Sequence, residues 1–272
     1  MFRPTMIRLA LLGAAVTAAI AAAVSLNRWR HRWGIDPADV DRILPGDDLV
    51  PAPSNVETRG IEINAPPAAV WPWLVQMGYE RAGWYSYDQL DMKGRSADEI
   101  LPELQSLAVG DIMPTFPGGG FEVRVLDQGR ALSLFTDSAI TSAQAAAFAE
   151  RPEAVPLGLQ ASGSFMRTTP PDFAASWTFV LDPLPGDRTR LVERVRVWFG
   201  AGTAVSAMTG PAFGFSVFLM TRRQMLGIRE RVERVVRATA AEPAAPAPAE
   251  GDLDSGHRPV EAEELVQSAP AS

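Results

Sequence analysis

The chain has 272 residues, 47% of them hydrophobic, and a formal net charge of −7. It contains no cysteine, one lysine (Lys93) and two histidines, His31 and His257, which lie near the two ends. The lack of cysteine excludes thiol nucleophiles, disulfides and thiolate metal sites. Because the central part lacks histidine, Ser-His-Asp triads and histidine-ligated metals are excluded there, and we predict neither a metal nor a cofactor.

Charge is distributed unevenly along the chain. Residues 1–32 contain five arginines and no acid, whereas residues 238–272 contain seven acids and one arginine. The remaining residues, 33–237, keep a net charge of −6. An acidic globular part repels phosphate backbones, so we predict that nucleic acid is not a partner.

The chain begins with a long apolar run. Leu9–Leu26 contains 18 residues without a charge, with arginines on both sides. A helix of that length spans about 27 Å, which is enough for the hydrocarbon core of a bilayer. We therefore predict a single-pass membrane anchor over residues 1–32, with Trp29 and Trp33 at the interface. A cleaved signal peptide is the alternative, because Ala21–Ala23 offers small residues for cleavage.

Two irregular segments flank the expected folded domain. Residues 33–56 carry four prolines together with Asp and Gly, which indicates a connector. Residues 238–272 are acidic and rich in Pro and Ala, which favours a disordered tail, with a docking segment as the alternative. The folded domain is therefore expected over residues 57–237. More arginines follow the apolar run than precede it, so the positive-inside rule places this domain in the cytoplasm.

The elements of the domain follow from hydrophobic periodicity. Residues 66–78 are predicted to form a helix that Pro72 should kink. The last element is an amphipathic helix of about 20 residues. Its apolar stripe, interrupted at Thr221, consists of Phe218, Met225, Ile228, Val232 and Val235. The predicted strands, of which the last four form two hairpins, are residues 59–64, 121–126, 131–135, 176–181 and 190–199.

This order of elements indicates the fold class. The strands are not interleaved with helices, which argues against a parallel doubly wound sheet. One strand, a short helix, several antiparallel strands and a long terminal helix predict an α+β domain. In this arrangement a curved antiparallel sheet wraps the C-terminal helix and leaves room for an apolar cavity.

Three stretches of the sequence resemble one superfamily. Ile63–Gly78 is similar to the first strand and helix of bacterial SRPBCC proteins, the START-like superfamily of polyketide cyclases and lipid transporters. Arg81–Asp88 and Met220–Arg231 fit the same subgroup. The resemblance covers about residues 57–237 and implies a helix-grip fold with a deep hydrophobic pocket. It implies no catalytic residue, and the alanine-rich residues 139–160 look like an insertion.

Aromatic side chains with polar groups cluster in the first third of the domain. Such side chains suit a pocket that binds an apolar ligand and holds one end of it by a hydrogen bond. The alternative is that they close the bottom of the sheet, with Asp88 capping a helix. The predicted ligand-binding residues are Trp71, Trp73, Trp84, Tyr85, Tyr87, Asp88, Trp177 and Glu193.

Glu193 stands out because of its position in a strand. With period-2 alternation it shares a face with Leu191 and Val195, while Arg194 and Arg196 point the other way. Burial on an apolar face raises the pKa of a carboxyl group, which could then hold a ligand or transfer a proton. The alternatives are a bulge that reverses the orientation and a structural pair with an arginine.

Glycine- and proline-rich stretches are expected around the pocket. Gly118–Gly120 precedes a strand rather than a helix, so we interpret it as a flexible loop at the rim and not as a phosphate site. Residues 137–160 and 200–214 are candidate lids.

Three functions are compatible with these observations. The first is membrane-tethered binding or transport of a small hydrophobic or lipid-like ligand. The second is a cyclase or dehydratase that uses Glu193, Asp88 or a tyrosine as acid or base. The third is an interaction protein that recruits a partner through its tail. The domain lacks histidine and cysteine, which favours binding over catalysis.

Overall fold

The computed structural model describes residues 4–91, 94–116, 119–149, 172–200 and 203–241, with side chains from residue 13 in the first helix and from residue 214 in the last. Within these ranges, six strands form one antiparallel sheet in the order β1-β6-β5-β4-β3-β2. The strands are β1 (Asn55–Ile63), β2 (Ile112–Phe116), β3 (Gly119–Asp127), β4 (Ala131–Asp137), β5 (Phe173–Leu184) and β6 (Arg188–Phe199).

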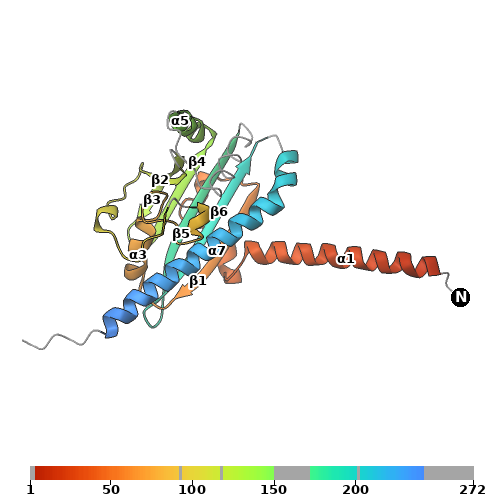
Figure 1. The fold of residues 1–272 in the computed structure, drawn as a ribbon, viewed down its shortest axis with the longest axis horizontal. Helices are drawn as coiled ribbons and strands as arrows, with labels where there is room; N and C mark the ends of the chain where they lie inside the picture. The colour runs from red at the N-terminus through yellow and green to blue at the C-terminus, as the bar shows by residue number, and fades with distance from the viewer. Residues whose placement is uncertain (1–3, 92–93, 117–118, 150–171, 201–202, 242–272) are drawn as a thin grey trace, which may run out of the picture.

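Helices cover one face of this sheet, which we call the inner face. The long helix α7 (Thr203–Ala241) crosses it diagonally (Figure 1), and α3 (Pro67–Val75) packs beside α7. The other helices are α1 (Pro4–His31), α2 (Pro37–Val40), α4 (Asp88–Asp91) and α5 (Ser138–Ala149), with 3-10 turns η1 (Asp47–Leu49) and η2 (Pro102–Leu104). The predicted α+β helix-grip class is therefore confirmed by the sheet order and the terminal helix.

Most predicted elements are present, with three corrections. Gly119 and Gly120 begin strand β3 and pair with β2, so the loop predicted there is wrong for these two residues. Strand β2, which contains Pro114, was not predicted. Helix α7 has 39 residues, not about 20, so it includes most of the predicted lid 200–214 and the first residues of the predicted tail.

Two other predicted segments fall partly outside the described residues. Helix α5, Ser138–Ala149, contains residues 139–149 of the supposed insertion and lies beside β3 and β4. The rest of that insertion, residues 150–160, and the acidic tail from residue 242 lie outside the described part of the chain.

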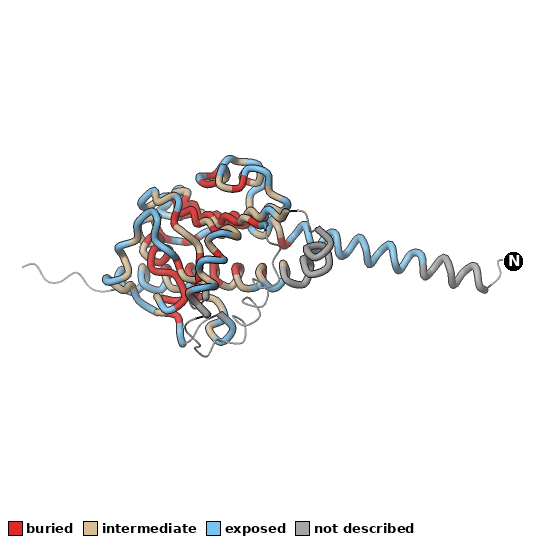
Figure 2. Tube along the Cα trace, turned by 90° about the horizontal axis from the view of Figure 1, so that it is seen from above, coloured by how far each residue is buried: buried red, intermediate tan, exposed pale blue. Residues whose placement is uncertain are grey.

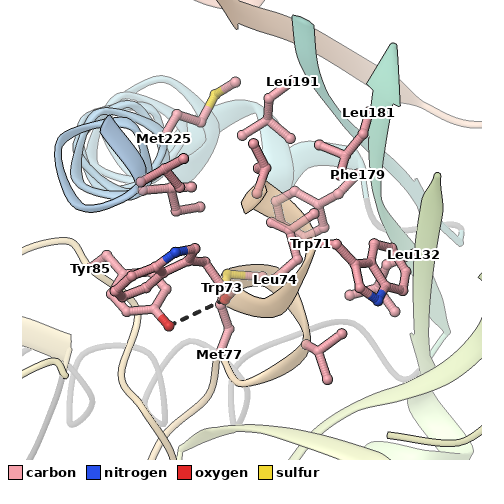
Figure 3. Close-up of a cluster of buried hydrophobic side chains, with 14 of the residues drawn as sticks. Trp71, Trp73, Leu74, Met77, Tyr85, Leu132, Phe179, Leu181, Leu191 and Met225 are labelled. Carbon is pink, nitrogen blue, oxygen red and sulfur yellow. Dashed lines mark hydrogen bonds between the residues drawn. The ribbon is translucent and has the colours of Figure 1, made fainter. Parts of the chain in front are cut away.

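The hydrophobic core lies between the inner face and the two helices (Figure 3). Helix α3 begins at prolines, which are tolerated in a first turn, and buries five consecutive or near-consecutive apolar side chains. Met225 and Ile228 of α7 meet Leu191 and Phe179 of the sheet, and each of these four is fully buried. Burying such a side chain contributes about 1.5–3 kcal/mol, so this layer fixes α7 on the sheet.

The opposite, outer face is covered by the predicted connector. Leu44 and the partly buried Ile35 pack against Ala131, Val180 and Val192 of the sheet. The connector is therefore an ordered layer of the fold, although the domain boundary at residue 57 stays a prediction.

Helix α1 extends away from the domain, and its residues 13–29 are exposed (Figures 1 and 2). Among the residues whose side chains are described, no helix is both long and apolar enough to cross a membrane. The described part of α1 is dominated by alanine and ends in arginines, which lowers its mean hydropathy. The predicted transmembrane helix is thus not found, although Leu9–Leu12 of the predicted span lie outside the side chains described.

The end of α1 is built into the domain. Arg30 is 8% exposed and donates from Nη1 to Glu57 Oε1 at 3.0 Å. The Gly60 amide donates to the Trp33 carbonyl, and Arg222 lies over the Trp33 ring. The arginine- and tryptophan-rich stretch predicted to sit at a membrane interface therefore also makes tertiary contacts with β1 and α7.

Candidate functional site

Glu193 lies on the inner face of the sheet, as its strand alternation predicts. Strand β6 pairs in regular register with both neighbours, and Glu193 stands opposite Arg59 of β1 and Phe179 of β5. The side chain of Glu193 has no exposed surface. Of the two alternatives considered for this residue, the bulge is wrong, and a partner arginine is present.

That partner, Arg59, is fully engaged by several groups. Its Nη1 lies 3.6 Å from Glu193 Oε2 and donates to Thr221 Oγ1 at 2.9 Å. Its Nη2 donates to Glu57. Its Nε donates to the Arg30 carbonyl at 3.1 Å. Strand β1, helix α7 and the end of helix α1 therefore meet at one guanidinium.

The two carboxylate oxygens of Glu193 differ. Trp177 Nε1 donates to Oε1 at 2.7 Å, which fixes the orientation of the carboxyl group. Oε2 has no hydrogen-bond partner among the described residues, and its distance from Arg59 is beyond hydrogen-bond range. One oxygen is thus held by a hydrogen bond, whereas the other is paired with the charge of Arg59 but has no hydrogen bond among the described residues and can accept one.

A second free acceptor comes from helix α7. Gln224 is 2% exposed, and its Nε2 donates to Met77 Sδ, while its Oε1 is without a partner in the described part of the chain. A buried acceptor left unpaired costs about 1–3 kcal/mol, and buried polar groups are normally satisfied. Glu193 Oε2 and Gln224 Oε1 are thus two buried oxygens of the domain interior that can each accept a hydrogen bond from a donor.

Burial governs the ionisation of this group. Desolvation raises the pKa of Glu193, and the nearby charge of Arg59 only partly opposes it. Desolvation likewise lowers the pKa of Arg59, which Glu193 opposes. Glu193 therefore keeps its proton to a higher pH than an ordinary glutamate.

Aromatic rings surround the Trp177 side of this carboxyl group. Trp84 and Trp177 are stacked with ring centroids 5.3 Å apart. The ring centroids of Phe121 and Phe179 lie 6.0 and 5.2 Å from that of Trp177. Trp177 itself is only partly buried. Glu193 therefore lies beside a wall of flat apolar side chains contributed by β3, β5 and the segment after α3.

Other predicted ligand residues are held by the fold. Trp71 and Trp73 are core residues of α3. Tyr85 has a φ of 57°, which is rare for a bulky residue. Its hydroxyl donates to the Trp73 carbonyl (Figure 3) and accepts from Gln76, and burial raises its pKa. A Cβ on Gly227 would lie 2.0 Å from the Tyr85 carbonyl oxygen, so α7 passes this backbone in close contact.

The two remaining predicted residues, Tyr87 and Asp88, have roles that differ from that of Glu193. Tyr87 is 43% exposed. Asp88 accepts hydrogen bonds from the backbone and hydroxyl of Ser96 and so stabilises the segment between them. The structure thus joins Trp84, Trp177 and Glu193 in one place, and ligand contact by any predicted residue stays a prediction.

Sequence reasoning missed Arg59, Thr221 and Gln224, although each left a signal. Arg59 precedes Ile61 in period-2 alternation, so it falls on the same face as the core residues of β1. Thr221 interrupts the apolar stripe of α7, and Gln224 follows it by one turn on the buried side. Polar residues at apolar positions of two elements indicated a buried polar cluster.

Two surface hollows lined by described residues lie elsewhere. One, of about 660 Å³, is lined mainly by arginines and acids along the second half of α7. The other, of about 970 Å³, lies between the end of α1 and the connector on the outer face. Both are rich in charged side chains, and neither is the apolar cavity that the sequence predicts.

Comparisons with known proteins give likeness of fold only. No family model and no curated protein matches this sequence. Solved structures that resemble it include proteins from Mesorhizobium loti (17% identity, TM-score 0.31, covering 65% of this chain and 97% of the other) and Chromobacterium violaceum (14%, 0.34, 66% and 97%). A Polyketide_cyc-like protein from Corynebacterium glutamicum is a further neighbour (15%, 0.26, 68% and 93%). The fold assignment itself rests on the strand order and terminal helix of this chain.

Proposed function

We propose that the domain binds a small apolar molecule that carries one hydrogen-bond donor, held between the inner face of the sheet and helix α7. The observation that carries this proposal is the buried Glu193 Oε2, which has no hydrogen-bond partner among the described residues and belongs to a carboxyl group held by Trp177, whose ring stacks on that of Trp84. Gln224 Oε1 of α7 is a second buried acceptor without such a partner. The rings offer a surface to the apolar body, and the acceptors offer a partner for its polar end.

The energetics favour a donor over an acceptor in the ligand. Arg59 already donates to Glu57, Thr221 and a backbone carbonyl, so an anionic ligand finds no uncommitted cation here. A ligand donor that reaches Glu193 Oε2 recovers the cost of an unpaired buried oxygen. We therefore expect alcohols and amines of low polarity to bind better than carboxylates of the same size.

A matched pair of fluorescent probes tests this preference. Aminopyrene and methylpyrene have nearly the same shape, but only the amine donates a hydrogen bond. Energy transfer from tryptophan to pyrene, measured on the full chain in detergent, should show roughly five- to tenfold tighter binding of aminopyrene. Equal affinity of the two probes, or no binding of either, would contradict the proposal.

The variant Glu193→Gln makes the test specific to this residue. Trp177 can still donate to the amide oxygen, so the amide nitrogen replaces Oε2, and this nitrogen cannot accept a hydrogen bond. The preference for aminopyrene should disappear. Glu62→Gln is the matched control, because Glu62 lies on β1 with an exposed side chain and should leave the preference unchanged.

Catalysis is the second candidate, and the raised pKa of Glu193 favours it specifically. A fixed, buried carboxyl group with one free oxygen can transfer a proton, as a cyclase or dehydratase requires. Tyr85 and Asp88 are less suited, because their polar atoms are engaged by Trp73, Gln76 and Ser96. If Glu193→Gln retains a co-purified molecule that the wild type converts, as judged by mass spectrometry, catalysis is supported; identical products from both variants would refute it.

We also propose that α1 tethers the domain to a membrane. In support, Leu9–Leu26 is an uncharged run, and its described part is exposed on every side. The tether shortens the path of a membrane-dissolved ligand to the domain. Flotation of the full chain with phosphatidylcholine vesicles tests this, and a protein that stays in the dense fraction would contradict it. Location of the domain in the cytoplasm remains part of the proposal.

A further inference from the structure

The end of α1 and the first described residues of α7 share an exposed apolar surface. Trp29 is 49% exposed, and Phe215 and Leu219, one turn apart on α7, are 38% and 40% exposed. Trp29 packs edge-on against Phe218 at 5.1 Å, and the rings of Phe218 and Phe215 are 6.1 Å apart. We call Trp29, Phe215 and Leu219 the junction surface, because all three gather where the two helices meet.

The junction surface continues along α1. Four further large apolar side chains of α1 are exposed by between 48% and 60%, namely Val16, Ile20, Val24 and Leu26. Exposed large apolar side chains gathered on two adjoining helices favour contact with a partner or a membrane. Phe215 and Leu219 belong to α7 and not to α1, so the contact must include α7 as well.

Positive charge lies next to this surface. Arg28 and Arg32 lie within one turn of Trp29, and both are exposed. They also line the outer-face hollow that contains Asp41 and Asp48, although neither forms an ion pair with another described residue. Exposed apolar side chains flanked by free arginines suit the surface of an anionic bilayer, where the rings enter the interface and the guanidinium groups meet lipid phosphates.

We propose that the junction surface seats the first described turns of α7 on an anionic lipid bilayer. This goes beyond tethering by α1, because it fixes the orientation of the domain as well as its distance from the membrane. Thr221 follows Leu219 by two residues and binds Arg59, the partner of Glu193. The bilayer then lies within a few turns of α7 from the buried polar cluster, and a ligand enters from the lipid phase.

Because the chain contains no cysteine, single labels can test this surface directly. Phe215→Cys and Leu219→Cys in the full chain are labelled with the fluorophore NBD and incorporated into vesicles of phosphatidylcholine and phosphatidylglycerol. Both labels should shift to shorter wavelength and lose emission when the vesicles carry doxyl-labelled lipid. Labels that keep the emission of water-exposed NBD at both positions would overturn the proposal.

Two matched positions serve as controls. Val235 lies on the same helix, 16 residues beyond Leu219 and so about 24 Å away, and is similarly exposed at 42%. Val109, 61% exposed, precedes the far edge strand β2. Labels at Val235→Cys and Val109→Cys should stay unquenched. Equal quenching at all four positions would show that the domain has no fixed orientation and would overturn the proposal.

Two further arms test the lipid charge and the competing occupant. Replacing phosphatidylglycerol with phosphatidylcholine, or introducing Arg28→Gln with Arg32→Gln, should reduce quenching at Leu219→Cys; no change would overturn the anionic assignment. A blue shift that already occurs in detergent and grows with protein concentration would assign the junction surface to a second copy of the chain instead. Probe binding in detergent is independent of these measurements, so failure here is distinguishable from failure of the ligand proposal.

Discussion

Glu193 and Arg194 are neighbours on β6, but their side chains lie on opposite faces of the sheet and differ in how many of their polar atoms form hydrogen bonds. On the outer face, Arg194 is 3% exposed, and all its nitrogens are engaged. Its acceptors are Thr58 Oγ1, Asp47 Oδ2 and the carbonyl oxygens of Arg42, Asp39 and Val40. On the inner face, Glu193 is fully buried and has one oxygen open. A saturated charge fastens parts of the fold together, whereas an unsaturated one is available to a ligand.

The largest expected effect on stability comes from removing Arg194, whose nitrogens all form hydrogen bonds. Arg194→Leu leaves Asp47 without its closest cation and frees three carbonyl groups of the connector. Loss of one partner of a buried pair costs about 3–5 kcal/mol, which should appear in the free energy of unfolding by urea. Arg188→Leu, on the same strand but 40% exposed, should cost less than about 1 kcal/mol. Equal costs would show that the connector contributes little to stability.

The contribution of Glu193 to the free energy of unfolding should change with pH in the opposite direction from that of an ordinary carboxylate. Burial raises the pKa of Glu193 above its usual value of 4.5, so the folded state holds this proton more tightly than the unfolded chain. The resulting stabilisation is complete below pH 4.5 and is lost as pH rises through the folded-state pKa. Glu193→Gln should remove this loss from urea titrations at several pH values. A wild type and variant with parallel profiles would place Glu193 in a solvated environment.

His31, next to the same network, should respond in the other direction. Burial, and then the charges of Arg30, Arg59 and Arg32, lower its pKa from 6.5 to about 4, although Glu57 Oε1 is 3.4 Å away. The neutral form therefore stabilises the fold above pH 6.5, and this stability is lost as pH falls towards 4. The loss is at most about 3 kcal/mol. His31→Asn should flatten the profile between these values, and an unchanged profile would contradict the assignment.

The smallest effect distinguishes a binding group from a structural one. Gln224→Leu removes a free buried acceptor of the inner face and should leave the free energy of unfolding unchanged or raise it by about 1 kcal/mol. The same variant should weaken the preference for aminopyrene over methylpyrene. Clear destabilisation would instead show that Gln224 holds α7 in place through its contact with Met77.

The local parts of this architecture could be predicted from the sequence. Alternation in β6 placed Glu193 and Arg194 on opposite faces, and the hairpins and terminal helix followed from periodicity. The length of α7 did not, because the glycine- and proline-rich residues 200–214 were interpreted as a lid, whereas the helix runs through Gly210 and Pro211. Intrinsic propensity is a weak guide where tertiary structure decides, and β2 was missed for the same reason, since Pro114 weakens its strand pattern.

The candidate site was predictable only in part, because its other members meet through the fold. Glu193 and Trp177 are 16 residues apart in sequence and adjacent in the sheet, which a hairpin pattern suggests. Arg30 and Thr221 reach Arg59 from separate helices over separations of 29 and 162 residues. A single sequence carries no information on such distant pairings.

Because the last turn of α1 and the residues after it supply hydrogen-bonding groups to the interior, truncation near the start of the domain should destabilise it. A shortened chain that begins at residue 34 loses the Trp33 carbonyl bound to Gly60 and the two groups through which Arg30 meets Glu57 and Arg59. Crystallisation of a shorter form should therefore remove the apolar run but retain Asn27–Trp33.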